Sequence, residues 1–235
     1  MNAAAPVVSD VEIQADSVVL DATLTIPRRP RGIVVFAHGS GSGRRSPRNR
    51  LVAEVLQRDG FATLLLDLLE PDETLNPDLR FDLGRLMGRL VAACGWTRTD
   101  SCLRDLSLGL FGGSTGAAAA LCAAAQLGDT VGAVVSRGGR PDLADCVLED
   151  VRSPVLLIVG EFDRAVRVWN EQALGRLRCV KRLTLVPGAC HLFEEPGALD
   201  EVARLASAWF QQHLIAPREE TPNQLPAASA NRRQV

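Results

Sequence analysis

The chain has 235 residues, of which 46% are hydrophobic, enough apolar side chain for one sizeable core. The net charge of −2 gives no sign of the basic surface that nucleic-acid binding requires. No apolar run approaches the roughly 20 residues that span a bilayer, and the N-terminus lacks the pattern of a signal peptide. We therefore expect a cytoplasmic protein with neither a nucleic-acid nor a membrane partner.

The six cysteines show no CxxC pair and no regular spacing. Isolated cysteines of this kind are typical of free thiols in a reducing compartment, rather than of a disulfide framework or a zinc site. We therefore expect no metal site.

Short β-rich runs alternate with helical patterns along most of the chain. The runs Val11–Gln14 and Val18–Ile26 predict an antiparallel opening hairpin. Six further strands are predicted at Ile33–Ala37, Ala62–Leu66, Ser107–Phe111, Val131–Ser136, Val155–Val159 and Arg182–Val186. Helices are predicted from Pro47 to the Asp59-Gly60 pair and near Asp82–Cys94, Ala117–Ala125, Pro141–Leu148, Val168–Leu177 and Leu199–Leu214.

Fully apolar strands that alternate with helices indicate an α/β fold with a mostly parallel central sheet and helices on both faces. Residues 1–215 are expected to form this single domain. Residues 216–235 are rich in Pro, Ala, Asn, Gln and Arg and are expected to form a flexible, solvated tail.

Ser114 lies in the frame Gly-x-Ser-x-Gly. The pentapeptide is common, but here an apolar strand precedes it and a run of alanines follows it. Strand, tight turn and helix together indicate a nucleophile elbow, which presents the serine hydroxyl at the edge of a sheet. Ser114 is therefore the candidate nucleophile.

A serine hydroxyl needs a base within hydrogen-bond reach and a third group that orients the base. Of the three histidines, His191 follows the last predicted strand, where the base of such a site belongs. His38 closes a strand beside Gly39 and fits a loop-shaping role. His213 is expected to be solvated on the last helix. His191 is therefore the candidate base.

The acid is expected between serine and histidine in chain order. Asp163 follows the strand Val155–Val159, and parallel strands present their carboxyl ends at one edge. Glu161 is its competitor, and Asp142, Asp145 and Asp150 are weaker alternatives. Asp163 is thus the predicted acid.

An oxyanion hole needs two backbone N–H groups directed at the developing charge. Thr115, which follows the nucleophile, is expected to give one, and Ser40 in the glycine-rich loop 38–43 the other. This loop lacks the Gly-Lys-Ser/Thr ending of a phosphate-binding P-loop. We therefore interpret it as part of the oxyanion hole.

Arginines cluster after that loop, and Arg137 and Arg140 flank a glycine pair at another strand end. One interpretation is a solvated face with ion pairs. The other is that Arg137 or Arg48 binds a substrate carboxylate with bidentate geometry.

From about Val11 to Leu214 these residues resemble the α/β-hydrolase superfamily. Segments 38–43, 111–116 and 187–193 look like its dienelactone hydrolase-related branch. The resemblance implies an eight-stranded, mostly parallel sheet, a Ser114–Asp163–His191 triad and ester hydrolysis through an acyl-enzyme. Dienelactone hydrolases proper use a cysteine nucleophile, so Ser114 is a departure that argues against dienelactone itself as the substrate.

Many relatives insert a cap domain between the two strands that here flank Arg137–Pro154. This segment is too short for one, so an open cleft is expected, bordered by Leu68–Asp100. Some relatives carry a phosphoribosyltransferase label. The chain shows no acidic-pair phosphoribosyl-binding motif, so that activity is not expected.

The predicted function is that of a serine hydrolase that needs no cofactor, a carboxylesterase for small to medium acyl esters. The same triad serves thioesterases, lactonases and acyltransferases, and a hydrolase fold without activity can bind small molecules. The expected partner is a small-molecule ester. The oligomeric state stays open, a homodimer included.

Overall fold

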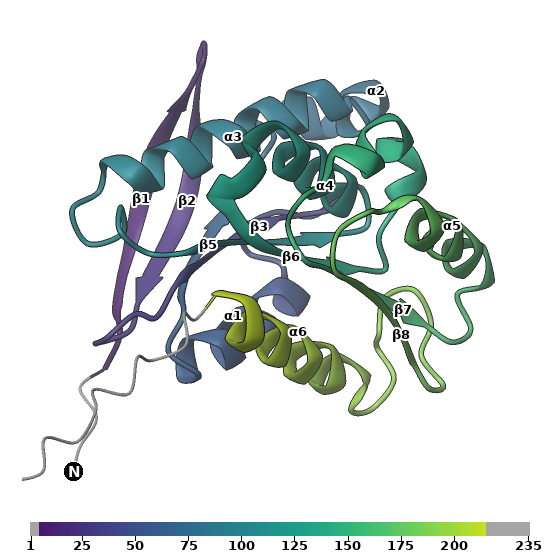
Figure 1. The fold of residues 1–235 in the computed structure, drawn as a ribbon. Helices are drawn as coiled ribbons and strands as arrows, with labels where there is room; N and C mark the ends of the chain where they lie inside the picture. The colour runs from purple at the N-terminus through teal and green to yellow at the C-terminus, as the bar shows by residue number, and fades with distance from the viewer. Residues whose placement is uncertain (1–4, 215–235) are drawn as a thin grey trace, which may run out of the picture.

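The computed structural model describes residues 5–214, and its centre is an eight-stranded sheet (Figure 1). The strands are β1 (Val7–Ala15), β2 (Val18–Ile26), β3 (Ile33–Ala37), β4 (Ala62–Leu66), β5 (Leu108–Gly113), β6 (Val131–Arg137), β7 (Val155–Gly160) and β8 (Lys181–Val186). Their order across the sheet is β1-β2-β4-β3-β5-β6-β7-β8. Only β2 runs against its neighbours, and all other adjacent strands pair in parallel. The predicted mostly parallel sheet with an opening hairpin is confirmed.

Helices cover both faces of the sheet. The α-helices are α1 (Pro47–Arg58), α2 (Pro77–Arg80), α3 (Leu83–Thr99), α4 (Thr115–Leu127), α5 (Arg164–Arg176) and α6 (Ala198–Leu214), and the 3-10 helices are η1 (Glu73–Leu75), η2 (Gly128–Thr130) and η3 (Pro141–Asp150). Helices α1 and α6 lie on one face, and α3, α4, α5 and η3 lie on the other (Figure 1).

Each face of the sheet buries its own apolar core. Leu90 of α3 and Leu121 of α4 belong to the core on one face, and Phe111 and Phe210 to the core beneath α1 and α6. The alanine-rich helix α4 is buried from Thr115 to Ala124. Its small side chains let it pack closely on the central strands, and this holds the turn before it in place.

Several elements extend beyond their predicted bounds. β1 begins at Val7 rather than Val11, because it is an exposed edge strand whose outer residues show no apolar pattern. Helix α5 begins at Arg164 rather than Val168, about one turn before its predicted start, where two arginines flank the buried Val166. The short helix after β6 is a 3-10 helix that is kinked at Ala144.

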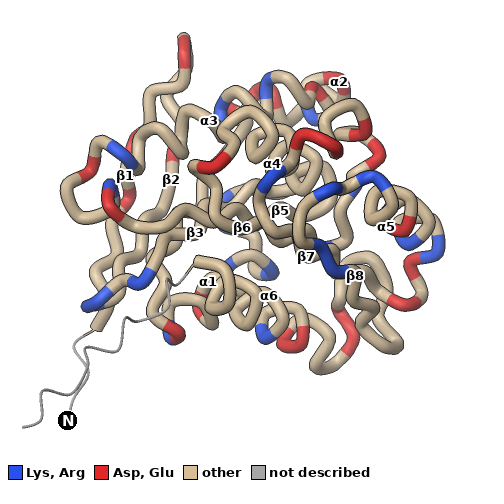
Figure 2. Tube along the Cα trace, in the orientation of Figure 1, with Lys and Arg blue, Asp and Glu red and all other residues tan. Residues whose placement is uncertain are grey.

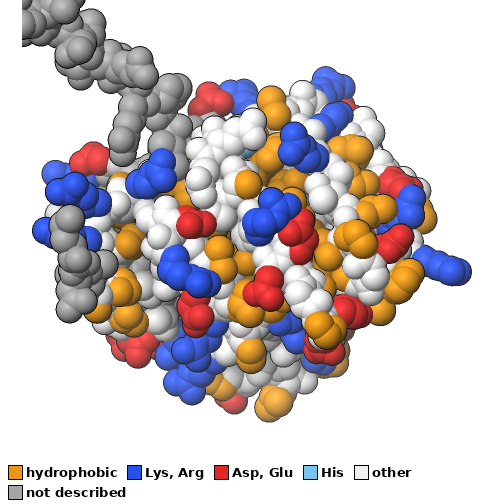
Figure 3. Space-filling view, turned by 90° about the horizontal axis from the view of Figure 1, so that it is seen from below, with side chains coloured by type: hydrophobic (Ala, Val, Ile, Leu, Met, Phe, Trp, Pro, Cys, Tyr) orange, Lys and Arg blue, Asp and Glu red, His pale blue; other side chains and the backbone are white. Residues whose placement is uncertain are grey.

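Most charged residues of the sheet lie on its outer strands β1, β2 and β8, and Arg137 ends β6. Strands β3, β4, β5 and β7 carry none (Figure 2). On the face that Figure 3 shows, basic and acidic side chains are interspersed. None of the helices in the described part of the chain has the length and hydrophobicity needed to cross a membrane.

Between β6 and β7 the chain forms only η3, so no cap domain is present there. This confirms the expectation from the short Arg137–Pro154 segment. The predicted tail at 216–235 lies outside the described residues.

Candidate active site

Ser114 makes the turn between β5 and α4 on its own. Its backbone has φ 52° and ψ −123°, a conformation that non-glycine residues rarely adopt and that costs about 1–3 kcal/mol. The Ser114 N–H donates to the carbonyl of Arg137 at 3.1 Å, and its carbonyl accepts from the N–H groups of Ala117 and Arg140. The turn is therefore fixed from both sides, with a half-buried serine at its tip.

The loop after β3 lies directly against this turn. A Cβ on Gly39 would stand 3.0 Å from Ser114 Cβ and 2.9 Å from the carbonyl oxygen of Gly113. Only a glycine allows this approach, which brings the neighbouring Ser40 beside the elbow.

His191 and Asp163, the base and acid expected from the sequence, lie in contact. His191 Nδ1 lies 2.6 Å from Asp163 Oδ2, and the Asp163 side chain is only 12% exposed. The backbone of the two loops is joined as well, because the Phe162 N–H donates to the Ala189 carbonyl at 2.9 Å. Loops from β7 and β8, far apart in the sequence, thus present one paired unit.

The histidine ring lies beside the elbow. A Cβ on Gly138 would stand 3.5 Å from His191 Cε1, and the preceding residue, Arg137, accepts the Ser114 N–H. Within residues 5–214 no hydrogen bond joins Ser114 Oγ to the ring. Contacts of this kind are often long in a free enzyme and tighten with substrate.

Glu161, the competing acid, is engaged elsewhere. Its Oε2 accepts the N–H of Gly188 at 2.8 Å, which ties the loop after β7 to the turn after β8. The structure therefore places Asp163, and not Glu161, on His191.

The expected oxyanion donors lie together, with one difference from the simple prediction. The Thr115 N–H is in the first turn of α4, where backbone N–H groups have no intrahelical acceptor. The Ser40 N–H instead donates to Thr115 Oγ1 at 2.8 Å. Sequence reasoning missed the Thr115 side chain, because no motif places this hydroxyl on a distant loop.

The other two histidines do not reach Ser114 through any hydrogen bond in the described chain. His38 Nε2 accepts the N–H of Leu68 at 2.8 Å, and Nδ1 lies 2.9 Å from the carbonyl of Gly39. Burial lowers the pKa of His38, so its neutral ring shapes the loop, as predicted. His213 is half-buried against Trp209, at 4.3 Å between ring centroids, and not solvated as expected.

Arg137 is a buried cation without a counter-ion. Its residue is 8% exposed, its guanidinium lies against Gly113, and no described residue forms an ion pair with it. Its Nε is buried and unpaired. Burial, and secondly the neighbouring Arg48, lower the pKa of Arg137 to about 10.

The neighbouring arginines are paired to different degrees. Arg44 contacts Asp67 at 2.8 Å and Arg140 contacts Asp142 at 2.7 Å. Arg48 has a weak contact of 3.5 Å to the exposed Glu194. Arg44 and Arg140 therefore form ion pairs, as one of the two interpretations of the arginines expects. That interpretation does not account for Arg137, which has no ion pair among the described residues.

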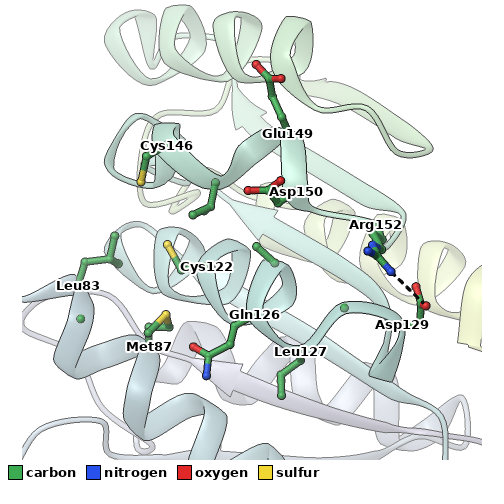
Figure 4. A pocket seen from close by; sticks show the side chains of 14 residues that line it. Leu83, Met87, Cys122, Gln126, Leu127, Asp129, Cys146, Glu149, Asp150 and Arg152 are labelled. Atoms are coloured by element: carbon green, nitrogen blue, oxygen red, sulfur yellow. Dashed lines mark hydrogen bonds and ion pairs between the residues drawn. The ribbon is translucent and has the colours of Figure 1, made fainter.

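A hollow of about 1070 Å³ lies between α3, α4 and η3, lined by Met87, Cys122 and Cys146 among others (Figure 4). Its residues Asp129 and Arg152 precede β6 and β7, so it opens at the amino ends of the strands. Ser114 and His191 lie at the carboxyl ends, so this hollow is not the site described above. In the described chain no cluster of three His, Cys, Asp or Glu side chains could hold a metal ion.

Comparisons with known proteins agree with this fold. No family model matches the chain. A crystal structure of a dienelactone hydrolase from Anabaena variabilis is 54% identical, with a TM-score of 0.87; the match covers 89% of this chain and 99% of that one. The chain belongs to the dienelactone hydrolase family. The predicted resemblance is thereby confirmed.

Two more distant solved structures with this fold are named as esterases. Est1E from Butyrivibrio proteoclasticus is 16% identical with a TM-score of 0.75, and the match covers 86% of this chain and 98% of that one. The esterase domain of a Rhodothermus marinus protein is 19% identical with a TM-score of 0.71, and the match covers 88% and 99%. At these identities the likeness shows the α/β-hydrolase fold alone.

The name of a curated relative differs from that of the dienelactone hydrolase. A Mycobacterium tuberculosis protein called a phosphoribosyl transferase is 54% identical over 217 residues, which cover 92% of this chain and 49% of the relative. The chain spans about half the length of the curated relatives it matches.

Proposed function

We propose that this protein is a serine hydrolase, a carboxylesterase that cleaves small to medium acyl esters through an acyl-enzyme. Ser114 is the nucleophile, His191 the general base and Asp163 the carboxylate that orients the base. The observation that carries the proposal is the 2.6 Å contact between His191 and Asp163 beside the strained Ser114 turn. Backbone strain of this kind is common at catalytic positions.

In this proposal each group of the triad has a separate role. Asp163 accepts the Nδ1–H of His191, so the neutral ring carries its free lone pair on Nε2. Nε2 takes the proton of Ser114 Oγ as the oxygen attacks the ester carbonyl. His191 then protonates the departing alcohol, and water repeats the sequence on the acyl-enzyme to release the acid. Asp163 stabilises the imidazolium in both steps.

The surroundings of Arg137 and Arg48 favour a negatively charged substrate. A buried cation without a partner is costly, and a carboxylate bound in bidentate fashion would offset that cost. The guanidinium of Arg137 lies against Gly113, directly before Ser114. We therefore propose that Arg137, with Arg48 beside it, binds a free carboxylate carried by the ester.

A lactone is the second candidate substrate, favoured by the name of the Anabaena variabilis relative. The same triad would also serve a thioesterase or an acyltransferase. Phosphoribosyl transfer is not proposed, because the protein of that name is about twice as long and this chain has no acidic-pair motif for a phosphoribosyl group.

Labelling with a fluorophosphonate probe tests the nucleophile. The wild-type protein should react and should hydrolyse p-nitrophenyl acetate, and Ser114→Ala should do neither, because it lacks the attacking oxygen. Cys190→Ala, which removes the exposed thiol beside His191, should keep both properties. Equal labelling of wild type and Ser114→Ala would refute the assignment.

A further inference from the structure

The Thr115 hydroxyl has a donor but no acceptor in the described chain. Thr115 is 2% exposed, and its Oγ1 accepts the Ser40 N–H at 2.8 Å. No described residue accepts the hydrogen of this hydroxyl. A buried hydroxyl beside Ser114 therefore has one hydrogen bond still to give, and buried polar groups are rarely left unsatisfied.

The peptide that donates to Thr115 is fixed from its other end. The Leu68 N–H donates to His38 Nε2 at 2.8 Å, and His38 Nδ1–H donates to the Gly39 carbonyl at 2.9 Å. Because burial keeps His38 neutral, one ring nitrogen accepts and the other donates. The Gly39–Ser40 peptide thus has a set orientation, and its N–H points at Thr115.

These hydrogen bonds run head to tail. Leu68 donates to His38, His38 to the Gly39–Ser40 peptide, and that peptide to Thr115. Such chains polarise their members, so the last donor is stronger than an isolated hydroxyl. That last donor is the Thr115 hydroxyl.

The hydroxyl also belongs to the residue whose backbone N–H is expected to bind the developing negative charge. Only Cα and Cβ separate Oγ1 of Thr115 from its own backbone nitrogen, which follows Ser114 directly. An oxyanion held by the Thr115 N–H is therefore within reach of the same residue's hydroxyl. If the Ser40 N–H bound the oxyanion itself, the buried Thr115 Oγ1 would lose its donor. Leaving a buried acceptor without a partner costs about 1–3 kcal/mol.

We propose that the Thr115 hydroxyl donates a hydrogen bond to the oxyanion, and that Ser40 acts through this hydroxyl rather than on the oxyanion directly. The inference rests on the proposed serine-hydrolase function. It puts this side-chain donor in place of the Ser40 backbone donor expected from the sequence, beside the Thr115 N–H, and it assigns His38 as a positioning residue for that donor.

The test replaces Thr115 with an isosteric residue that has no hydroxyl. In Thr115→Val, kcat for p-nitrophenyl acetate should fall about 100-fold, as on loss of one oxyanion donor, with KM close to wild type. Thr115→Ser keeps the hydroxyl and should keep most of the activity. The affinity for phenylboronic acid, whose tetrahedral adduct places an oxygen in the same position, should fall in Thr115→Val in parallel with kcat.

Thr97→Val is the matched control. Thr97 is fully buried in α3, where its hydroxyl donates to the Cys94 carbonyl at 2.7 Å, so the variant should lose stability without losing kcat. Thr115→Ala makes the same test if the valine variant does not fold. An unchanged kcat in Thr115→Val or Thr115→Ala, or a raised one, would overturn the inference, and so would failure of Thr115→Ser to restore activity.

The two proposals fail in different ways. If wild type is inactive and unlabelled by the fluorophosphonate, the proposed function fails. If wild type and Thr115→Val are both labelled at Ser114 and turn over equally, only the inference about Thr115 fails.

Discussion

Single residues at the carboxyl edge of the sheet have sharply different surroundings although they are close in sequence. Asp163 and Glu161 both follow β7, yet one contacts His191 and the other accepts the Gly188 N–H. The two side chains have different surroundings because the chain turns between Glu161 and Asp163. In this turn the Asp163 N–H donates to the Gly160 carbonyl at 3.0 Å. The roles of these two carboxylates can be separated by amide substitution.

In Asp163→Asn, kcat for an activated ester should fall on the order of 1,000- to 10,000-fold, because the amide no longer selects the histidine tautomer that accepts a proton. Glu161→Gln should stay near wild type, since its amide oxygen can still accept the Gly188 N–H. Steady-state kinetics on the two variants decides between the acids. A large loss in Glu161→Gln with an active Asp163→Asn would reverse the assignment.

At the scale of elements, η1 and α3 are joined by one buried carboxylate. Glu73 of η1 accepts from Arg85 and Arg89 of α3, and Arg89 also donates to the Leu68 carbonyl at 2.8 Å. The Glu73 and Arg89 side chains are 12% and 7% exposed. This cluster fixes the segment Leu68–Asp100, which the sequence predicted as a border of the cleft.

The Arg89 guanidinium lowers the pKa of Glu73 to about 2. The contribution of Glu73 to stability should therefore be complete above about pH 4.5, where the unfolded carboxyl is ionised, and be lost as the pH falls from there towards 2. At pH 7, Glu73→Gln should lower the free energy of unfolding by about 1–3 kcal/mol, the range for losing a hydrogen bond to a charged group. Urea unfolding of both proteins between pH 7 and pH 3 measures the effect.

The control is Glu201→Gln, which removes a more exposed pair with Arg204 and should change stability little. A difference between wild type and Glu73→Gln that does not shrink in acid would contradict the assignment.

For the whole molecule, the absence of a cap between β6 and β7 leaves the carboxyl edge of the sheet accessible. The His191 side chain is 39% exposed there, and the buried Arg137 has no counter-ion among the described residues. Substrate choice should therefore depend on charge rather than on fit to a lid.

Arg137→Met keeps the packing volume and removes the charge. It should lower kcat/KM for p-nitrophenyl hemisuccinate about 10- to 100-fold, the value of a hydrogen bond to a charged group, and leave p-nitrophenyl butyrate almost unchanged. Arg140→Met removes a paired arginine at the same strand end and should not discriminate between the two esters. Equal effects of Arg137→Met on both esters would show that Arg137 does not bind substrate charge.

Much of the fold could be predicted because it depends on local pattern. Apolar strands such as Ile33–Ala37 and Ala62–Leu66 occur where the sequence predicts them, since both faces of each are buried. The bounds of β1 and α5 could not be predicted, because their exposed residues carry no periodic signal.

The sequence by itself determined the strand–turn–helix unit around Ser114, the chain order of Ser114, Asp163 and His191, and the lack of a cap between β6 and β7, because each depends on short-range pattern and segment length. Only the tertiary structure decided that Asp163 contacts His191, that Arg137 has no counter-ion and that Ser40 donates to Thr115. These facts depend on where side chains from distant loops point. That direction is set by packing around the sheet edge, which no local motif encodes.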